Sequence, residues 1–181
     1  MKVKFITGNA NKLEEVKKML SPVEVEQLDV DLAEIQSLDA HKIIRHKLQE
    51  ALTNSETNII VEDTSLYLEC LKDKLPGPYI KWFLESLKPE GIANLAKKMG
   101  NTKAFCLTIF GYAKSKDEIE FFEGRNDGEI VEPRGGKDFG WGPIFQPRGS
   151  DKTYGEMERD EKYATSMRAA AAKKLKEYLL R

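Results

Sequence analysis

Two adjacent acidic residues end an apolar stretch, where their carboxylates could bind a cation. Glu62 and Asp63 directly follow the apolar run 59–61, so a predicted buried strand ends in two carboxylates that need partners. Neighbouring strand residues face opposite sides, so we expect one carboxylate to face a cleft and the other to brace the loop. Glu34, which ends the preceding β-like stretch, could converge on the same point. Three carboxylates would suit Mg²⁺; the alternative is a strand end held by salt bridges.

The segment TGNANK, residues 7–12, offers a site for phosphate. It joins a predicted strand to a predicted helix, so free backbone N–H groups and the positive helix end would point at one spot. Thr7 and Asn9 add side-chain donors, and Lys12 adds a positive charge. The spacing of a P-loop is absent. The alternative interpretation is an ordinary capped helix start.

An aromatic loop, KDFGWGPIFQPRG at residues 137–149, could supply a wall for a planar ligand such as a nucleobase. Glycine and proline bend the backbone there, and the rings need either burial or a flat partner. The alternative is a corner of the hydrophobic core. Lys47 and Lys81 are candidates to surround the phosphates of such a ligand, although each alone is more often a solvated lysine. Lys162 and Arg168 follow the loop closely enough to reach the base edge or the phosphates.

The order of predicted elements favours a mixed α/β fold. Strand patterns occupy residues 2–7, 23–32, 58–63 and 103–113, and another β pattern with a turn at the NDG motif spans 118–131. Helical patterns begin at residues 9 and 79, surround residues 43–52, restart near Pro89 and fill 164–180. We expect one domain, residues 1–181, with an elongated mixed central sheet flanked by helices. Its two lobes would enclose an active-site cleft beyond the strand ends.

Composition excludes several classes of partner. The 29 basic and 30 acidic residues leave a net charge of −1 without long blocks of one sign, so we expect neither nucleic-acid nor polybasic membrane binding. No apolar run approaches a bilayer span, and MKVKFIT lacks the features of a signal peptide. Cys70 and Cys106 are isolated, as are His41 and His46, which argues against a disulfide framework or a Cys/His zinc site. These features predict a cytoplasmic, enzyme-sized domain with reduced thiols.

Motifs along nearly the whole chain, in their family order, resemble one known family. They are TGNANKLEEV, VEDTSL, LPGPYIKWFLE, FEGR, PRG, FGWGPIFQP, TYGEM and SMR. The chain thereby resembles the eukaryotic-type inosine triphosphate pyrophosphatases, the Ham1-like enzymes. The resemblance implies a homodimeric, Mg²⁺-dependent hydrolase that cleaves noncanonical purine nucleoside triphosphates (ITP, dITP or XTP) to the monophosphate and pyrophosphate.

The resemblance also implies roles for individual residues. Asp63 would orient or deprotonate the attacking water, with Lys12 and Glu34 as further catalytic residues; Glu34, Asp63 and Glu62 would hold the metal. The implied substrate-binding residues are Thr7, Gly8, Asn9, Ala10, Asn11, Lys12, Lys47, Thr64, Lys81, Phe139, Gly140, Trp141, Gly142, Lys162, Ser166, Met167 and Arg168.

Three positions depart from the family pattern, all near the expected base edge. Gly142 stands where the family has Asp, Tyr163 where it has Asn, and Met167 where it has His. The phosphate and metal positions match. Two other functions stay open: a nucleotide-binding module of the same fold with degenerate base recognition and little turnover, or a nucleotide-dependent transferase or kinase. The matching carboxylates argue against the first, and no acceptor site marks the second.

Overall fold

The computed structural model describes residues 1–30, 32–53, 57–137 and 140–181; Phe139, expected at the base, lies outside them. The strands are β1 (Lys2–Ile6), β2 (Glu24–Leu28), β3 (Ile59–Leu68), β4 (Pro76–Gly77), β5 (Lys103–Ala113), β6 (Ile119–Ile130) and β7 (Phe145–Pro147). The helices are α1 (Ala10–Leu20), α2 (Ala40–Thr53), α3 (Ile80–Lys98), α4 (Arg159–Thr165) and α5 (Met167–Leu179), with short 3₁₀ turns η1 (Glu69–Leu71) and η2 (Gly142–Ile144).

The strands form one mixed sheet of seven strands within the described residues. Its order is β2-β1-β3-β5-β6-β7, and β4 pairs with β3. β1 runs parallel to both β2 and β3, whereas β3 with β4 and β6 with β7 are antiparallel. The predicted mixed α/β class is therefore confirmed. The long strands β3, β5 and β6 each contribute residues to two compact units of the chain.

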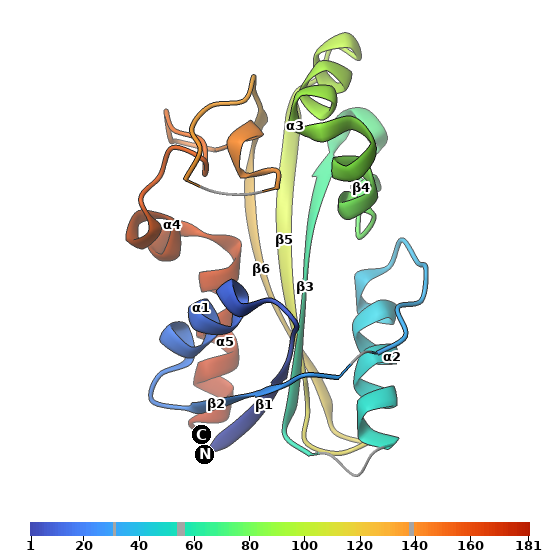
Figure 1. The fold of residues 1–181 in the computed structure, drawn as a ribbon, viewed down its shortest axis with the longest axis vertical. Coiled ribbons are helices and arrows are strands. Elements are labelled where there is room, and N and C mark those ends of the chain that lie inside the picture. Colours follow the sequence, from blue (N-terminus) through green and yellow to red (C-terminus); the bar gives the residue numbers. More distant parts are fainter. Residues whose placement is uncertain (31, 54–56, 138–139) are drawn as a thin grey trace. The chain divides into compact units, whose positions relative to one another are not determined.

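Unit 1 comprises residues 1–63, 108–124 and 168–181. In this unit α1 and α5 cover one face of the sheet and α2 covers the other (Figure 1). The α1/α5 side is closed by aliphatic and aromatic side chains of β1, β3 and β5, among them Phe5, Ile60 and Phe110. On the α2 side, a Cβ at Gly111 would lie 2.3 Å from Ile44 and 2.9 Å from Leu48. Glycine at this position therefore lets α2 pack closely against β5.

Unit 2 comprises residues 64–107 and 125–167. Its core gathers the second half of β3, the first half of β5, α3, the η2–β7 segment and the following loop, with Phe145 and Tyr154 fully buried. α3 contains a break at Lys88 (φ 58°, ψ 170°) directly before Pro89. The two helical patterns predicted there are thus two helical segments joined at a kink. No helix among the described residues combines the length and apolarity needed to span a membrane.

β3 is longer than predicted, which changes the setting of the two acidic residues. The strand continues to Leu68, so Glu62 and Asp63 lie inside it and not at its end. The extension is stabilised by burial of Leu66 and Leu68 in the core of unit 2 and by antiparallel pairing with β4. The polar residues Glu62 and Asp63 therefore do not end β3, because the strand is buried on both sides of them.

The NDG motif at residues 126–128 was wrongly predicted as a turn. β6 runs through it without interruption, and Gly128 pairs with Pro147 of β7. A Cβ at Gly128 would lie 2.3 Å from the carbonyl oxygen of Gln146. The glycine therefore serves the close approach of a neighbouring strand, a known alternative to a turn.

The terminal helix is also shorter than predicted, because the chain straightens at Ser166 (φ −76°, ψ 154°). The preceding residues form the separate helix α4 of seven residues. Met167 then begins α5, the Ala- and Lys-rich helix that the sequence predicts.

Candidate functional site

The TGNANK segment forms a short, internally bonded connection between β1 and α1. The Asn9 side chain caps α1 by accepting a hydrogen bond from the Lys12 backbone N–H at 3.1 Å. The Thr7 hydroxyl accepts from the Asn9 N–H at 3.1 Å, and Gln27 donates to the Thr7 carbonyl at 2.8 Å. Capping at Asn9 is confirmed. Such contacts hold the positive end of α1 in place, which is the geometry that favours an anion.

The outer side of this connection is accessible. Gly8, Ala10 and Asn11 are exposed, and a Cβ at Gly8 would meet no atom within 4 Å. A phosphate group could therefore approach the backbone of the segment without a steric barrier at Gly8. Contact with phosphate stays a prediction.

Behind this connection lies a buried network of opposite charges. The Glu62 carboxylate, whose side chain is 0% exposed, accepts from Arg168 Nε at 3.1 Å and from the adjacent terminal nitrogen at 3.3 Å. The other terminal nitrogen of Arg168 donates to Glu15 on α1. Lys12 Nζ lies 3.4 Å from Glu62. The network therefore links α1, β3 and the first turn of α5.

The electrostatics of Arg168 follow from this arrangement. Burial alone lowers the pKa of its guanidinium, but the attraction of the Glu62 and Glu15 carboxylates outweighs burial and raises the pKa above its ordinary value. Arg168 therefore remains charged, and all three of its nitrogens face carboxylates. Sequence reasoning placed Arg168 at the base edge or the phosphates; in this structure it braces three elements.

Glu15 is a member of the network that sequence reasoning missed. The local sequence gives one indication of this role. Glu15 follows Lys12 by three positions on α1, and the next residue, Val16, is buried. Nothing in the sequence connects it with Arg168, which lies 153 positions away. Only the packing of α5 beside α1 brings the two together.

Glu62 and Asp63 serve opposite faces of the sheet. Val61 lies on the α2 side, where its side chain is 3.6 Å from the position that a Gly111 Cβ would take beside Ile44. Side chains alternate along β3, so Asp63 shares the α2 face with Val61, whereas Glu62 faces Lys12 and Arg168. The two carboxylates therefore cannot act on the same ion from a regular strand.

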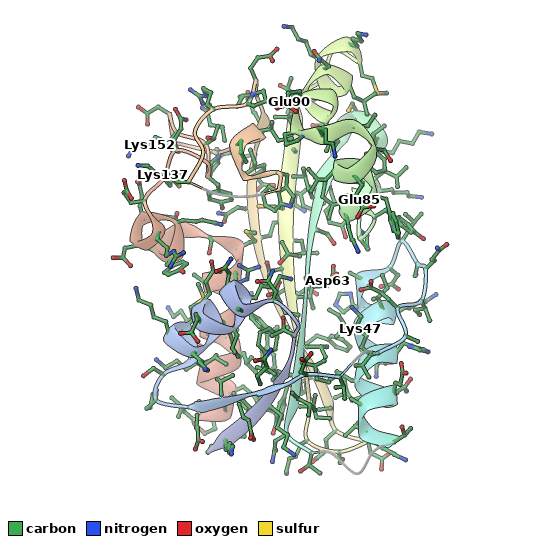
Figure 2. The ribbon with its side chains drawn as sticks, viewed as in Figure 1. Lys47, Asp63, Glu85, Glu90, Lys137 and Lys152 are labelled. Carbon is green, nitrogen blue, oxygen red and sulfur yellow. The ribbon has the colours of Figure 1, made fainter. Side chains whose placement is uncertain are left out.

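The α2 face also carries the ion pair between Glu34 and Lys47. The Lys47 ammonium contacts the Glu34 carboxylate, and the Lys47 side chain is 21% exposed. Lys47 lies on α2 and Asp63 midway along β3 (Figure 2). In the described ranges, no three His, Cys, Asp or Glu side chains gather as a metal site. Glu62 turns to Lys12 and Arg168, away from the face that Asp63 shares with Val61, and metal binding by Glu34, Glu62 and Asp63 stays a prediction.

Residues 140–147 of the aromatic loop pack as a corner of the unit 2 core. Trp141 is half-buried, and its ring meets Phe145 edge-on at a centroid distance of 5.6 Å and Tyr154 at 6.2 Å. The Gly142 carbonyl accepts from the Gly155 N–H at 3.0 Å, and Gly140 has a positive φ of 66°. The loop is thus held by packing on one side of the indole, and a role as a base wall stays a prediction.

The other predicted residues of unit 2 differ in their surroundings. Lys162 lies over the Tyr154 ring with its ammonium 5.8 Å from the centroid, and Ser166 is buried. Lys81 is exposed beside Glu85 and Trp82, and Thr64 is half-buried on β3. Within unit 2, Lys162 therefore lies near the aromatic loop, because Tyr154 also contacts Trp141, whereas Lys81 lies on α3 beside other side chains of that helix.

Met167 is a core residue. It is 3% exposed, and its sulfur lies 3.5 Å from the Cys106 thiol and 3.9 Å from the Tyr154 hydroxyl. The side chain packs inward at the start of α5, and its contact with a base stays a prediction.

Comparison with known proteins places these features in a family. A sequence model of the Ham1 family matches residues 3–178. The fold is similar to that of the Ham1 protein of Staphylococcus aureus, with 24% identity over 99% of this chain and 98% of that one, and a TM-score of 0.85. The fold is also similar to that of a HAM1 protein from Coxiella burnetii, with 20% identity over 99% of this chain and 98% of that one, and a TM-score of 0.88. A third similar structure is a nucleoside-triphosphatase / dITP/XTP pyrophosphatase from Mycobacterium abscessus, with 23% identity over 97% of this chain and 98% of that one, and a TM-score of 0.77. These matches do not distinguish a eukaryotic-type branch. Because the family match covers residues 3–178, nearly the whole chain, the chain belongs to the Ham1 family.

Proposed function

We propose that this protein hydrolyses noncanonical purine nucleoside triphosphates (ITP, dITP and XTP) to the monophosphate and pyrophosphate. The observation that carries the proposal is the capped, accessible start of α1, with Lys12 beside it, in a member of the Ham1 family. The structural similarity to a dITP/XTP pyrophosphatase agrees with this substrate class. A helix N-terminus with a nearby lysine is suited to a polyphosphate.

In the proposed reaction, the oxygen of a water molecule forms a bond to the α-phosphorus. The bond between the α-phosphorus and the oxygen that bridges to the β-phosphorus breaks, and pyrophosphate leaves. The start of α1, Lys12 and Lys47 would stabilise the charge that accumulates on the phosphates, with Lys81 and Lys162 as further cations. Glu62 has a positioning role: its carboxylate holds the Lys12 ammonium and Arg168.

Asp63 is the proposed acceptor of the water proton. It lies on the opposite face of β3 from Glu62, on the side of the sheet that α2 covers. An ionised carboxylate can act as a weak general base toward water. The nearby Glu34–Lys47 pair supplies both a second carboxylate and a cation on the same side of the sheet.

The residues present fit Mg²⁺ through two carboxylates. Mg²⁺ commonly binds one or two carboxylates together with substrate phosphates and water, and Glu34 and Asp63 offer that number without Glu62. When bound, Mg²⁺ would neutralise charge on the phosphate oxygens. The absence of a group of three ligands in the described part of the chain is compatible with such a site, because the triphosphate would provide the remaining oxygens.

Recognition of the base is assigned to the aromatic loop and the residues beside α4. Trp141 would stack on the base, with Gly140 and Gly142 beside it and Ser166 closing the site. Stacking tolerates different bases, and Arg168 contributes hydrogen bonds to a 6-oxopurine only if it leaves its carboxylate partners. We therefore propose that the preference for 6-oxopurines is weak in this protein.

A product assay tests the proposed function. ITP, XTP, GTP and ATP are each incubated with the protein and Mg²⁺, and both phosphate-containing products are identified. We expect monophosphate and pyrophosphate from ITP and XTP, with kcat/KM above that for ATP by less than about a hundredfold, the loss of one charged hydrogen bond being worth roughly 1.5–3 kcal/mol. Release of a nucleoside diphosphate would indicate kinase-like or transferase chemistry, and binding without products would indicate a nucleotide-binding module.

We also propose that the protein is a cytoplasmic homodimer. Both cysteines are free thiols, as expected in a reducing compartment. On the first segment of α3, Ile80 is buried and Phe83 and Leu84 pack against the core, but Trp82 and Leu87 remain exposed at 55% and 42%. Sedimentation at micromolar concentration is expected to show a dimer, and a Trp82→Glu variant to shift it toward monomer. A wild-type monomer under these conditions would contradict the assignment.

A further inference from the structure

The short helix α4 depends on contacts outside itself. It has seven residues, none of them buried, and its N-cap residue Glu158 makes no side-chain capping bond. Isolated helices shorter than about 12 residues are marginal in water because nucleation is costly. Yet α4 carries Lys162 and leads directly into Ser166, two residues of the proposed site. A contact that holds the C-terminal end of α4 therefore also positions Lys162 and Ser166.

Asn126 on β6 holds that end. Its side-chain amide donates to the carbonyl oxygen of Thr165, the last residue of α4, at 2.6 Å. The same amide nitrogen donates to the Tyr154 hydroxyl at 2.6 Å. The last carbonyls of a helix lack partners within the helix, so an amide from a neighbouring strand satisfies one of them. Sequence reasoning took Asn126 for part of a turn.

The contacts continue from Asn126 to the first residue of α5. The Tyr154 hydroxyl, which accepts from Asn126, donates to the Met167 sulfur, and the Cys106 thiol lies against the same sulfur. Burial raises the pKa of Cys106 to about 12, so the thiol keeps its proton and can act as a donor. Asn126 and Tyr154 therefore hold both sides of the bend at Ser166, and the Tyr154 ring also lies beneath Lys162.

We propose that Asn126 is a positioning residue for substrate binding, which acts by keeping α4 folded against β6. The role of Asn126 in substrate binding rests on the proposed function for Lys162 and Ser166. Its role in keeping α4 folded does not depend on that function. If α4 is ordered only part of the time, the apparent dissociation constant rises in inverse proportion to the competent fraction. Saturating substrate restores the ordered helix, so KM should rise while kcat stays nearly constant. Loss of folded protein would instead lower kcat.

Asn126→Asp tests this directly, because it keeps the side-chain shape and replaces the donor by a carboxylate that faces the negative end of α4. Hydrogen exchange monitored by mass spectrometry should show the amides of residues 159–165 exchanging about tenfold faster, as expected for loss of a helix cap, with the strands unchanged. KM for ITP should rise about three- to tenfold, with kcat within about twofold of the wild type. Asn126→Ala removes the bond without adding charge and should give a smaller change in the same direction.

Asn101→Asp is the matched control. Asn101 lies in the same unit, but its side-chain oxygen accepts a hydrogen bond from Lys103 N–H at 3.0 Å, which aspartate preserves. It should match the wild type in both measurements. Unchanged exchange of α4 in both Asn126 variants would overturn the proposal, as would faster exchange with an unchanged KM. If the wild type hydrolyses no nucleotide while Asn126→Asp still loosens α4, the proposed function fails and the role of Asn126 in holding α4 stands.

Discussion

Replacing Asp63 with asparagine is expected to lower kcat/KM for ITP at least a hundredfold while leaving the fold unchanged. Asparagine keeps the size of the side chain but cannot accept a proton, and general-base catalysis contributes roughly 10²–10⁴-fold to rates. Asp63 is half-buried on the α2 face of β3 and lies outside the contacts among Glu62, Arg168 and Glu15. Steady-state release of pyrophosphate measures the loss, and circular dichroism with thermal denaturation measures the fold.

The control for this substitution is Asp117→Asn, which makes the same chemical change at an exposed position before β6. Its kcat/KM should equal that of the wild type. Turnover of Asp63→Asn within a few-fold of the wild type would show that another group accepts the proton. A large fall in melting temperature would show that Asp63 has a structural role instead.

Replacing the adjacent Glu62 with glutamine is expected to act mainly on stability. The Glu62 side chain is fully buried and makes a two-pronged ion pair with Arg168, which is itself nearly buried. Removing one partner of a buried ion pair leaves an uncompensated charge and typically costs about 3–5 kcal/mol. Glu15 still contacts Arg168 in the variant, so we expect a loss of unfolding free energy near the lower end of this range. Urea denaturation followed by tryptophan fluorescence and circular dichroism measures it.

Glu132→Gln provides the comparison, because Glu132 pairs with Lys97 at 3.1 Å while both side chains remain mostly exposed. Exposed pairs contribute under about 1 kcal/mol, so this variant should lose little stability. Equal losses in the two variants would contradict the importance of the buried network. Adjacent residues of one strand should thus give different phenotypes, loss of turnover for Asp63 and loss of stability for Glu62.

Local features of the site were predictable from the sequence because their causes lie within a few residues. A strand that leads into a capped helix accounts for β1, Asn9 and α1, and alternation accounts for the opposite faces of Glu62 and Asp63. The order of motifs along the chain was sufficient to indicate the family that the comparisons confirm. These signals depend on backbone geometry and nearby side chains, which a linear sequence records.

The partners of charged and polar side chains were decided by the tertiary structure. Arg168 meets Glu15 and Glu62, which lie 153 and 106 positions away, and Asn126 meets Thr165 at a separation of 39 positions. The sequence offers several possible cationic partners for each carboxylate, and the periodicity of apolar residues does not show which one forms the ion pair. Burial makes the choice, because a charge removed from water must meet whichever opposite charge the packed helices bring to it.

The same reason accounts for features that the sequence did not predict. Residues 126–128 have the composition of a turn, yet β6 continues there because β7 pairs closely with Gly128. Met167 packs against Cys106 and Tyr154, contacts that only the folding of distant segments brings about. The sequence alone determined the fold class, the capped start of α1 and the family. The packing of distant segments decided which side chains brace the protein, because burial and pairing depend on neighbours that are remote in the chain.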